Sequence, residues 1–264
     1  MTDADLPTTE ALRVEVDGAI GRITLARPGK LNALNRAALE ELALAASWFD
    51  GHRSVKVVIV SGDGSSFSAG FDLSDPRWAE LGPPERSAVV GRAMAEAIGG
   101  MRAITIASIR GHCIGGGVVL ASACDLRVAS DTAQFKIPEV DLGVPLYWTG
   151  IPRLVRELGP ALTKELVLTG RPFAAEEAGT MRFVNRVVPD GELEGATQAL
   201  AVELAAKPAL VLEATKRQLE EAAPSVPATD RGAEDDARAF AEAQGDPESL
   251  ASAAAYVRRV RGKA

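Results

Sequence analysis

The chain has 264 residues and a formal charge of −7, with 47% hydrophobic and 25% charged residues. These fractions are typical of a globular protein and exclude a disordered or collagen-like chain. The negative charge argues against nucleic-acid binding, because neutralising phosphates requires a basic face. No run approaches the roughly 18 to 20 apolar residues of a membrane helix, and the acidic N-terminus lacks the apolar segment of a signal peptide. We therefore expect a cytoplasmic enzyme without nucleic-acid or membrane partners.

Cysteine and histidine are both scarce in this chain. Cys113 and Cys124 cannot form a disulfide scaffold by themselves, which indicates a reducing compartment. His52 and His112 lie far apart and show no metal-ligand spacing with the cysteines. We therefore expect no metal site.

The N-terminal part of the chain begins with a predicted hairpin. Residues 12–16 and 20–25 alternate apolar and polar side chains around the turn sequence Asp17-Gly18. Apolar residues at helical spacing predict a helix over 36–49, and a continuous β-branched run predicts a buried strand over 55–60. The same pattern then recurs, and it predicts helices over 85–101 and 116–123 and strands over 105–109, 126–128 and 134–137.

The pattern changes from Ile151 onward. Strand signals nearly vanish apart from 183–188, and helical periodicity continues to a last helix over 248–259, with residues 224–227 as a joint between helices. We therefore predict an α/β core over residues 1–190 and a helical C-terminal region over 191–264. These helices are too small to hold a core alone, so they should pack on the core or on a neighbouring subunit.

A first candidate site is the loop from Ser61 to Leu73, which follows the predicted buried strand. Small residues in this loop allow the backbone to approach a ligand closely, and loops after core strands commonly carry sites in α/β proteins. An ordinary strand-to-helix turn explains the same residues equally well.

A second candidate is the triple glycine, Gly115 to Gly117, at the start of a small-residue helix. The first N–H groups of a helix have no partner within it, and the helix dipole is positive at that end. An anion or a developing oxyanion suits such a place. Close packing of the helix on a strand selects glycine as well, and it remains an alternative.

A third candidate is Glu139, which follows Pro138 at the end of an apolar strand. Burial would raise the pKa of its carboxyl group toward the range of a general base, although an isolated glutamate is far more often solvated. His112 lies between small residues, where a packed or hydrogen-bonded role is commoner than a catalytic one.

Taken in order, these segments resemble the crotonase, or enoyl-CoA hydratase/isomerase, family, and the likeness covers almost the whole chain. The motifs that carry it are Arg27-Pro28, Asn32 to Leu34, Phe67 to Leu73, Gly111 to Asp125, Phe135 to Glu139, Leu168 to Gly170, Ala175 to Ala178 and Val184 to Pro189. The resemblance implies an α/β fold of the crotonase (ClpP-like) type, a spiral of strand-strand-helix units. It also implies C-terminal helices that support a homotrimer or a dimer of trimers.

The resemblance further implies a coenzyme A thioester as substrate, of the kind found in fatty acid metabolism, and no separate cofactor. In this family two backbone N–H groups hold the thioester oxygen, and the matching positions are Phe71 and Gly116. Each such donor can contribute about 3 to 4 kcal/mol to a developing oxyanion. By the same resemblance the coenzyme A moiety should lie along Lys30, Ala33, Ala69, Gly70, Phe71, Asp72 and Leu73, with Gly116 also in contact.

One departure from the family pattern bears directly on the reaction. Family hydratases use two glutamates; Glu139 matches the second, but Val119 stands at the position of the first. Losing one general acid-base group costs roughly 10² to 10⁴ in rate, so hydration is disfavoured. Isomerisation of a 3-enoyl thioester needs one base, and we predict a 3,2-enoyl-CoA isomerase that uses Glu139.

Two alternatives remain open. One is a crotonase-fold protein that binds acyl-CoA without catalysis. The other is weak hydratase activity or another thioester reaction, such as hydrolysis, assisted by Asp72, Asp141 or His112.

A second departure from the family pattern is the bulky stretch Leu146-Tyr147-Trp148, where the family often has small residues. These side chains either narrow the acyl pocket or fill the core.

Overall fold

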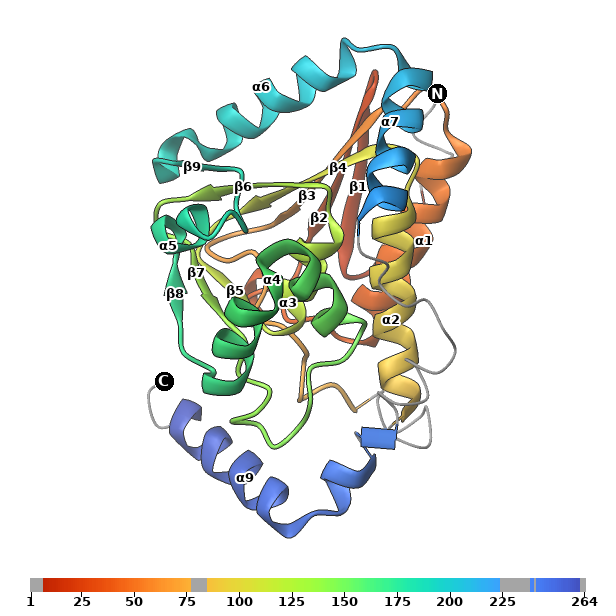
Figure 1. The fold of residues 1–264 in the computed structure, drawn as a ribbon. Helices are drawn as coiled ribbons and strands as arrows, with labels where there is room; N and C mark the ends of the chain where they lie inside the picture. Colours follow the sequence, from red (N-terminus) through yellow and green to blue (C-terminus); the bar gives the residue numbers. More distant parts are fainter. Residues whose placement is uncertain (1–6, 77–84, 224–237, 240, 262–264) are drawn as a thin grey trace.

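The computed structural model describes residues 7–76, 85–223, 238–239 and 241–261. Its main sheet has six strands, and only the first pair, joined by the Asp17-Gly18 turn, is antiparallel. In spatial order the strands are β1 (Leu12–Asp17), β2 (Ile20–Leu25), β3 (Val57–Gly62), β4 (Ile104–Ile109), β6 (Leu126–Ser130) and β9 (Arg186–Val188) (Figure 1).

A second sheet of three short strands lies beside the first and positions two of the candidate segments. Its strands are β5 (His112–Ile114), β7 (Gln134–Lys136) and β8 (Phe173–Ala174). Because β5 and β7 are parallel, with Ile114 opposite Lys136, their carboxyl ends lie side by side. The Gly115 amide donates to the Lys136 carbonyl at 2.8 Å. The pairing therefore brings the triple glycine next to the segment that leads to Glu139.

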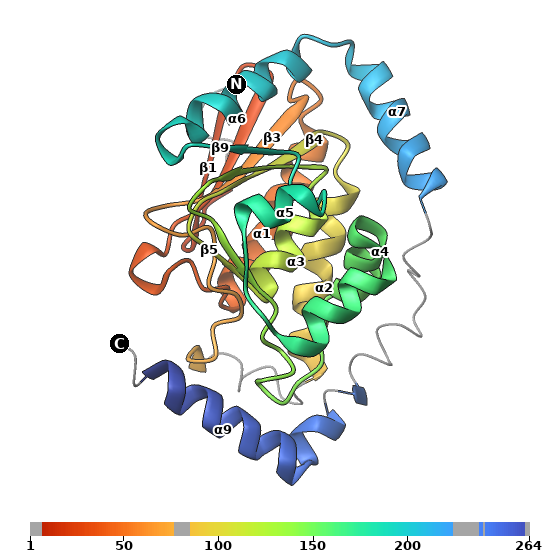
Figure 2. The same ribbon diagram turned by 60° about the vertical axis from the view of Figure 1, so that its left-hand side comes forward.

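Helices cover both faces of the main sheet. Figure 2 shows α6 on one side of it and α1, α2 and α3 on the other. The helix bounds are α1 (Arg36–Gly51), α2 (Glu85–Gly100), α3 (Gly116–Ala123), α4 (Gly150–Thr169), α5 (Ala175–Thr180), α6 (Leu193–Ala205), α7 (Ala209–Ala222) and α9 (Pro247–Arg261), with the 3₁₀ turns η2 (Pro28–Lys30) and η4 (Asp190–Glu192). None of these helices has both the length and the apolar composition that a bilayer crossing would require.

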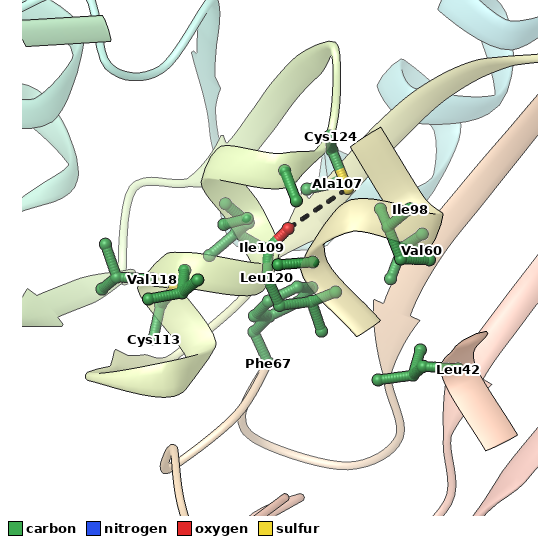
Figure 3. Packing of buried hydrophobic residues seen from close by; sticks show 14 of the residues in the cluster. Leu42, Val60, Phe67, Ile98, Ala107, Ile109, Cys113, Val118, Leu120 and Cys124 are labelled. Atoms are coloured by element: carbon green, nitrogen blue, oxygen red, sulfur yellow. Dashed lines mark hydrogen bonds between the residues drawn. The ribbon is translucent and has the colours of Figure 1, made fainter. Parts of the chain in front are cut away.

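The double cover explains why β3 is apolar at every central position. Val58 and Val60 belong to the large cluster under α1 to α3, whereas Val57 and Ile59 belong to a second cluster under α6. Successive side chains of a strand point to opposite faces, so a sheet covered on both sides has apolar residues throughout. Figure 3 shows side chains of the large cluster, among them Leu42, Val60, Phe67, Ile98 and Leu120.

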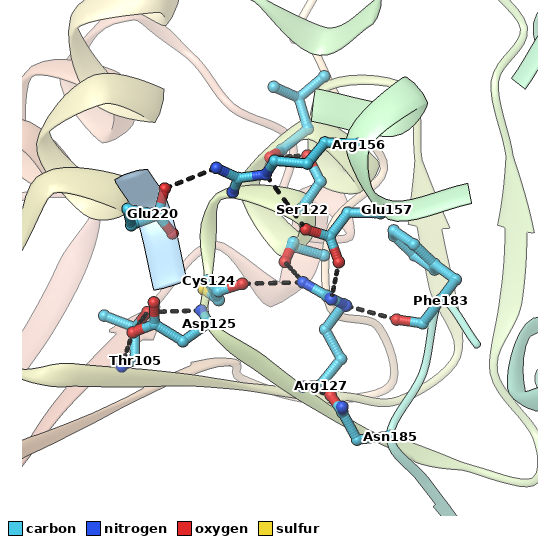
Figure 4. Close-up of polar contacts among 12 residues, drawn as sticks. Thr105, Ser122, Cys124, Asp125, Arg127, Arg156, Glu157, Phe183, Asn185 and Glu220 are labelled. Atoms are coloured by element: carbon cyan, nitrogen blue, oxygen red, sulfur yellow. Dashed lines mark hydrogen bonds and ion pairs between the residues drawn. The ribbon is translucent and has the colours of Figure 1, made fainter. Parts of the chain in front are cut away.

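The C-terminal helices are attached differently. Ion pairs hold α7 to the core: Lys216 contacts Asp125 at 2.7 Å, and Arg156 contacts Glu220 at 2.6 Å. Beside them the buried Arg127 donates to Glu157 and to the carbonyls of Cys124 and Phe183, which joins β6 to α4 and to the turn before β9 (Figure 4). In Figure 1, α9 lies at the opposite end of the molecule from α6.

The structure confirms most predicted elements and corrects some of their bounds. The hairpin and the helix over 116–123 are confirmed. The strand predicted over 55–60 occupies 57–62. The strand predicted over 183–188 is wrong in its first half, because the chain bends over 183–185 after Arg182, whose φ is 62°, and β9 begins only at Arg186. The helical pattern after 151 is confirmed, with a break at Gly159 in α4.

Some predictions remain outside what the structure describes. The joint over 224–227 lies in the segment 224–237, beyond the described residues. The division of the chain at residue 190 stays a prediction, although α6 packs on the core sheet through Leu193, Leu200 and Ala201.

Candidate active site

The loop that ends at Asp72 runs as an extended segment between two other parts of the chain. On one side, Ser68 exchanges backbone hydrogen bonds with His112 and Ile114 at 2.9 and 3.0 Å. On the other, the Leu34 amide donates to the Gly70 carbonyl at 2.7 Å, and the Asp72 amide donates to the Leu34 carbonyl at 3.0 Å. These bonds fix the backbone around Phe71 in one position.

Gly70 allows this loop to contact the start of α3. Its φ is +84°, and a methyl group there would lie 2.5 Å from the Ile114 carbonyl oxygen and 3.3 Å from the Gly116 nitrogen. A side chain would therefore force the loop away from the helix. The structure thus places Gly70, the neighbour of Phe71, against the start of α3. The pairing of the Phe71 and Gly116 amides stays a prediction.

Polar side chains fasten the loop to the segment 27–34. Arg27 donates to the Ala33 carbonyl and, at 2.8 Å, to the Asp72 carboxylate. Asn32, which is 1% exposed, donates to the carbonyls of Asp63 and Ser66 at 2.8 and 2.7 Å. Burial by itself would raise the pKa of Asp72, but hydrogen bonds from Ser74 and Arg27 outweigh it and lower the pKa. Asp72 is therefore an anchored carboxylate rather than a proton carrier.

Gly116 begins α3. Its amide belongs to the first turn, whose N–H groups have no acceptor within the helix. The preceding Gly115 has a φ of +49°, and its carbonyl accepts bonds from Val118 and Val119 at 2.8 and 3.1 Å. The start of α3 thus presents backbone donors at the positive end of the helix dipole.

Glu139 lies against this helix start. It is 9% exposed, and its Oε2 is buried and has no hydrogen-bond partner among the described residues. A methyl group on Gly115 would lie 2.5 Å from its Oε1. Burial raises the pKa of Glu139 to about 7, against smaller lowering effects of its own backbone and of Lys136. The carboxyl group therefore contacts Gly115, the residue that precedes Gly116, and burial brings its pKa close to neutral pH.

Val119 and Trp148 complete the surroundings. Val119 is fully buried, and it meets Leu146 where both contact Gly150. The Trp148 indole packs on Gly116 and lies 6.1 Å from the Phe71 ring, measured between centroids. The bulky stretch thus borders the candidate site, whereas an ionisable group is absent at position 119.

Other predicted residues take different places. Lys30 is exposed at the end of η2, Ala33 is half-buried, Ala69 lies on the extended loop, and Leu73 is 63% exposed. Asp141 pairs with Lys136 at 3.0 Å and with Arg259 at 3.2 Å, and the His112 side chain is exposed on β5. No group of three or more His, Cys, Asp or Glu side chains within the described ranges is arranged to hold a metal ion.

The two thiols are buried and free, and burial raises the pKa of both, that of Cys124 to about 12. A reactive cysteine is a thiolate at neutral pH, so neither residue has the character of a nucleophile.

Sequence reasoning missed the contacts of α9. Tyr256 lies with its ring 5.4 Å from the Lys136 ammonium group, and Arg259 reaches Asp141. Gly143 packs directly on the Ser249 backbone. The helix therefore holds the segment that follows Glu139. No local sequence pattern predicts these contacts, because they join residues more than a hundred positions apart in the chain.

The chain resembles known proteins over most of its length. A model of the enoyl-CoA hydratase/isomerase family matches residues 15–261. A probable enoyl-CoA hydratase of Mycobacterium tuberculosis is 38% identical over 200 residues, which are 75% of this chain and 76% of the relative. The peroxisomal Delta(3,5)-Delta(2,4)-dienoyl-CoA isomerase of Arabidopsis thaliana is 33% identical over 232 residues, or 83% and 84% of the two chains.

Solved structures agree with the sequence matches. A crystal structure of a Thermobifida fusca protein in complex with CoA has a TM-score of 0.73 and 34% identity, and the match covers 94% of this chain and 95% of that chain. Together with the sheet topology, these matches define a crotonase-fold enzyme. The chain belongs to the enoyl-CoA hydratase/isomerase family, whose members act on thioesters of coenzyme A.

Proposed function

We propose that this protein is a 3,2-enoyl-CoA isomerase in which Glu139 is the only acid-base residue. The observation that carries the proposal is the buried carboxyl group of Glu139, whose Oε2 has no partner among the described residues, next to a fully apolar position 119. A base held beside the oxyanion donors suits proton transfer within the substrate, because the same group removes and returns the proton.

The reaction follows from the two parts of the site. The Glu139 carboxylate takes a proton from the α-carbon of a 3-enoyl thioester, and the electron pair of that C–H bond shifts to leave a dienolate. The negative charge gathers on the thioester oxygen, to which the Phe71 and Gly116 amides donate. The Glu139 carboxyl group then returns the proton to the γ-carbon, which gives the 2-enoyl thioester. A pKa of about 7 allows Glu139 to accept and release the proton near neutral pH.

Substrate binding and assembly extend this proposal. We propose that the coenzyme A moiety lies along Lys30, Ala33 and the backbone of 69–73, and that Gly116 contacts the thioester. A chain of charge −7 then binds an anionic substrate through local donors alone. The C-terminal helices are proposed to support a homotrimer or a dimer of trimers, which the native mass in solution tests directly.

Hydration of a 2-enoyl thioester is the second candidate, and the name of the Mycobacterium tuberculosis relative favours it. Val119 argues against it, because a valine can neither hold water nor transfer a proton. Binding without catalysis is the third, and it predicts tight binding without turnover.

One experiment separates the three. The protein is incubated with 3-hexenoyl-CoA in deuterated water, and double-bond migration and deuterium uptake at the α- and γ-carbons are followed, with hydration of 2-hexenoyl-CoA measured alongside. We expect isomerisation with exchange, and a loss of roughly 10² to 10⁴ in rate for Glu139→Gln. Glu15→Gln, a change at an exposed residue of β1, is the matched control and should leave the rate unchanged.

Exchange that persists in Glu139→Gln would remove Glu139 from the role of base. Hydration faster than isomerisation would favour the second candidate, and binding without exchange would favour the third.

A further inference from the structure

The Trp148 indole is inserted between two glycines of different helices. On α2, a methyl group at Gly91 would overlap the pyrrole edge of the ring, at Nε1 and Cε2. On α3, a methyl group at Gly116 would overlap the benzo edge, at Cζ3 and Cη2. The indole thus spans the space between the helices, and it fits only because both positions lack a side chain. Trp148 is 4% exposed.

The backbone that carries this ring is held firmly. Trp148 and Thr149 both have left-handed φ values, 61° and 58°, which non-glycine residues adopt only when their surroundings impose it. The guanidinium of Arg153 donates to the Thr149 hydroxyl at 3.2 Å and to the Ala95 carbonyl of α2 at 3.0 Å. Leu146 is buried beside Val119 at Gly150. The backbone on both sides of Trp148 is therefore held in place, and the indole forms a wall against Gly116.

The position of this wall matters for an acyl group at Gly116. In the proposed function, on which this inference rests, the thioester oxygen lies at the Gly116 amide. The acyl carbons next to that carbonyl then start within van der Waals reach of whatever packs on Gly116, and that is the benzo edge of Trp148. Phe71 carries the other proposed oxyanion donor, and its ring, 6.1 Å from the indole, restricts the space on that side.

We propose that Trp148 determines substrate specificity by closing the acyl site, so that the protein selects short-chain acyl thioesters. Gly91 acts as a positioning residue, because its missing side chain sets how far the indole stands from Gly116. Each methylene that gains a buried place is worth about fourfold in affinity or kcat/KM, so enlarging the site should show a graded response to chain length.

The test compares Trp148→Leu with the wild type on 3-butenoyl-, 3-hexenoyl-, 3-octenoyl- and 3-decenoyl-CoA. We expect the wild type to favour the shorter two, and Trp148→Leu to raise the octenoyl-to-hexenoyl ratio of kcat/KM at least about tenfold, consistent with two accommodated methylenes. Trp48→Leu, at the stacked tryptophan of α1, is the matched control and should leave this ratio unchanged.

Gly91→Ala tests the same wall from the other side. The added methyl group should push the indole toward Gly116 and lower kcat/KM for every chain length. The double variant Gly91→Ala/Trp148→Leu should regain the chain-length profile of Trp148→Leu, because the clash is gone. Additive losses in the double variant would overturn the contact on which the proposal depends.

Calorimetric binding of butyryl-CoA and octanoyl-CoA distinguishes this proposal from the proposed function. If no variant moves a double bond but Trp148→Leu gains affinity for octanoyl-CoA relative to butyryl-CoA, the isomerase fails and the specificity wall stands. If isomerisation is observed but the chain-length profile of Trp148→Leu equals that of the wild type, the wall is refuted and the isomerase stands.

Discussion

The extended loop that ends at Asp72 and the segment from Glu139 to Thr149 both contact the start of α3, but different forces hold them. The loop is fixed by backbone hydrogen bonds and by the ion pair between the half-buried Arg27 and the buried Asp72. The segment instead carries a buried carboxyl group, one oxygen of which has no partner in the part of the chain that the structure describes, and two consecutive left-handed residues. The first arrangement satisfies its polar groups, whereas the second pays a cost in stability.

This difference assigns separate tasks to the two regions. Backbone donors that are held rigidly can stabilise charge on any thioester oxygen, whatever the reaction. In the proposed function, the chemistry and the choice of acyl group depend on the side chains of Glu139, Val119 and Trp148. Strain and unsatisfied polarity thus lie in the region to which we assign the reaction, and the following experiments measure that contrast.

The largest expected effect is a change in the free energy of unfolding with pH, which comes from Glu139. The pKa of Glu139 is raised from 4.5 to about 7 by burial. Below pH 4.5 the folded and unfolded states both bind the proton, and between pH 4.5 and 7 only the folded state keeps it, so this contribution to stability falls as pH rises through that window. The loss amounts to roughly 3 kcal/mol at pH 8.

Glu139→Gln cannot ionise, so its free energy of unfolding relative to the wild type should improve by roughly 3 kcal/mol between pH 4 and pH 8. Urea unfolding at the two pH values measures this, and comparing the difference removes the constant effect of a buried amide. Glu15→Gln provides the baseline. If the free energies of unfolding of Glu139→Gln and the wild type differ by the same amount at both pH values, then ionisation of Glu139 does not destabilise the folded state.

A smaller effect is expected at the loop. Arg27→Ala removes hydrogen bonds to Asp72 and to the Ala33 carbonyl, and should destabilise the fold by about 2 kcal/mol, the scale of a hydrogen bond to a charged group. The loop backbone should also loosen, which raises KM for the acyl-CoA. Arg13→Ala breaks an exposed pair of similar length, Arg13–Asp63 at 3.0 Å, and should cost much less. If thermal unfolding shows that Arg27→Ala and Arg13→Ala lose the same stability, the anchoring role of Arg27 is refuted.

The smallest effect concerns the pH dependence of the rate. In the proposed mechanism the ionised form of Glu139 is the base, so kcat/KM should be level above about pH 7 and fall about tenfold per unit of pH below it. Lys136 lowers the pKa of Glu139, so Lys136→Met should move the midpoint to higher pH. Lys164→Met, at an exposed position of α4, should not move it. A profile that is flat from pH 5 to 8 would exclude Glu139 as the titrating group.

Elements with a clear local pattern were predictable. The hairpin of β1 and β2 combines alternation with a turn sequence, and α3 begins at its glycines as expected. β5 and β8 were missed, because strands of three and two residues are too short to show a period. β3 begins two residues after the start of its apolar run, since the Val55 amide still bonds back to His52 in a turn.

The candidate site was predictable in its residue types but not in its geometry. Its glycines and Glu139 were found because their motifs are contiguous in the chain. Burial of Glu139 was one of two open possibilities, and the pairing of β5 with β7 decided it by placing the carboxyl group against Gly115. The role of Trp148 was undetermined, because it depends on Gly91 and Gly116, which come from two other helices.

The sequence by itself determined the family, the order of the strand and helix units, the glycines at the start of α3, and the loss of one carboxylate at position 119. Each of these depends on neighbours along the chain, which a pattern can carry. Only the tertiary structure decided that Glu139 is buried with a raised pKa, that Arg27 fastens the loop, and that the Trp148 indole closes on Gly116. Desolvation and steric contact arise between segments brought together by folding, and therefore no local pattern contains them.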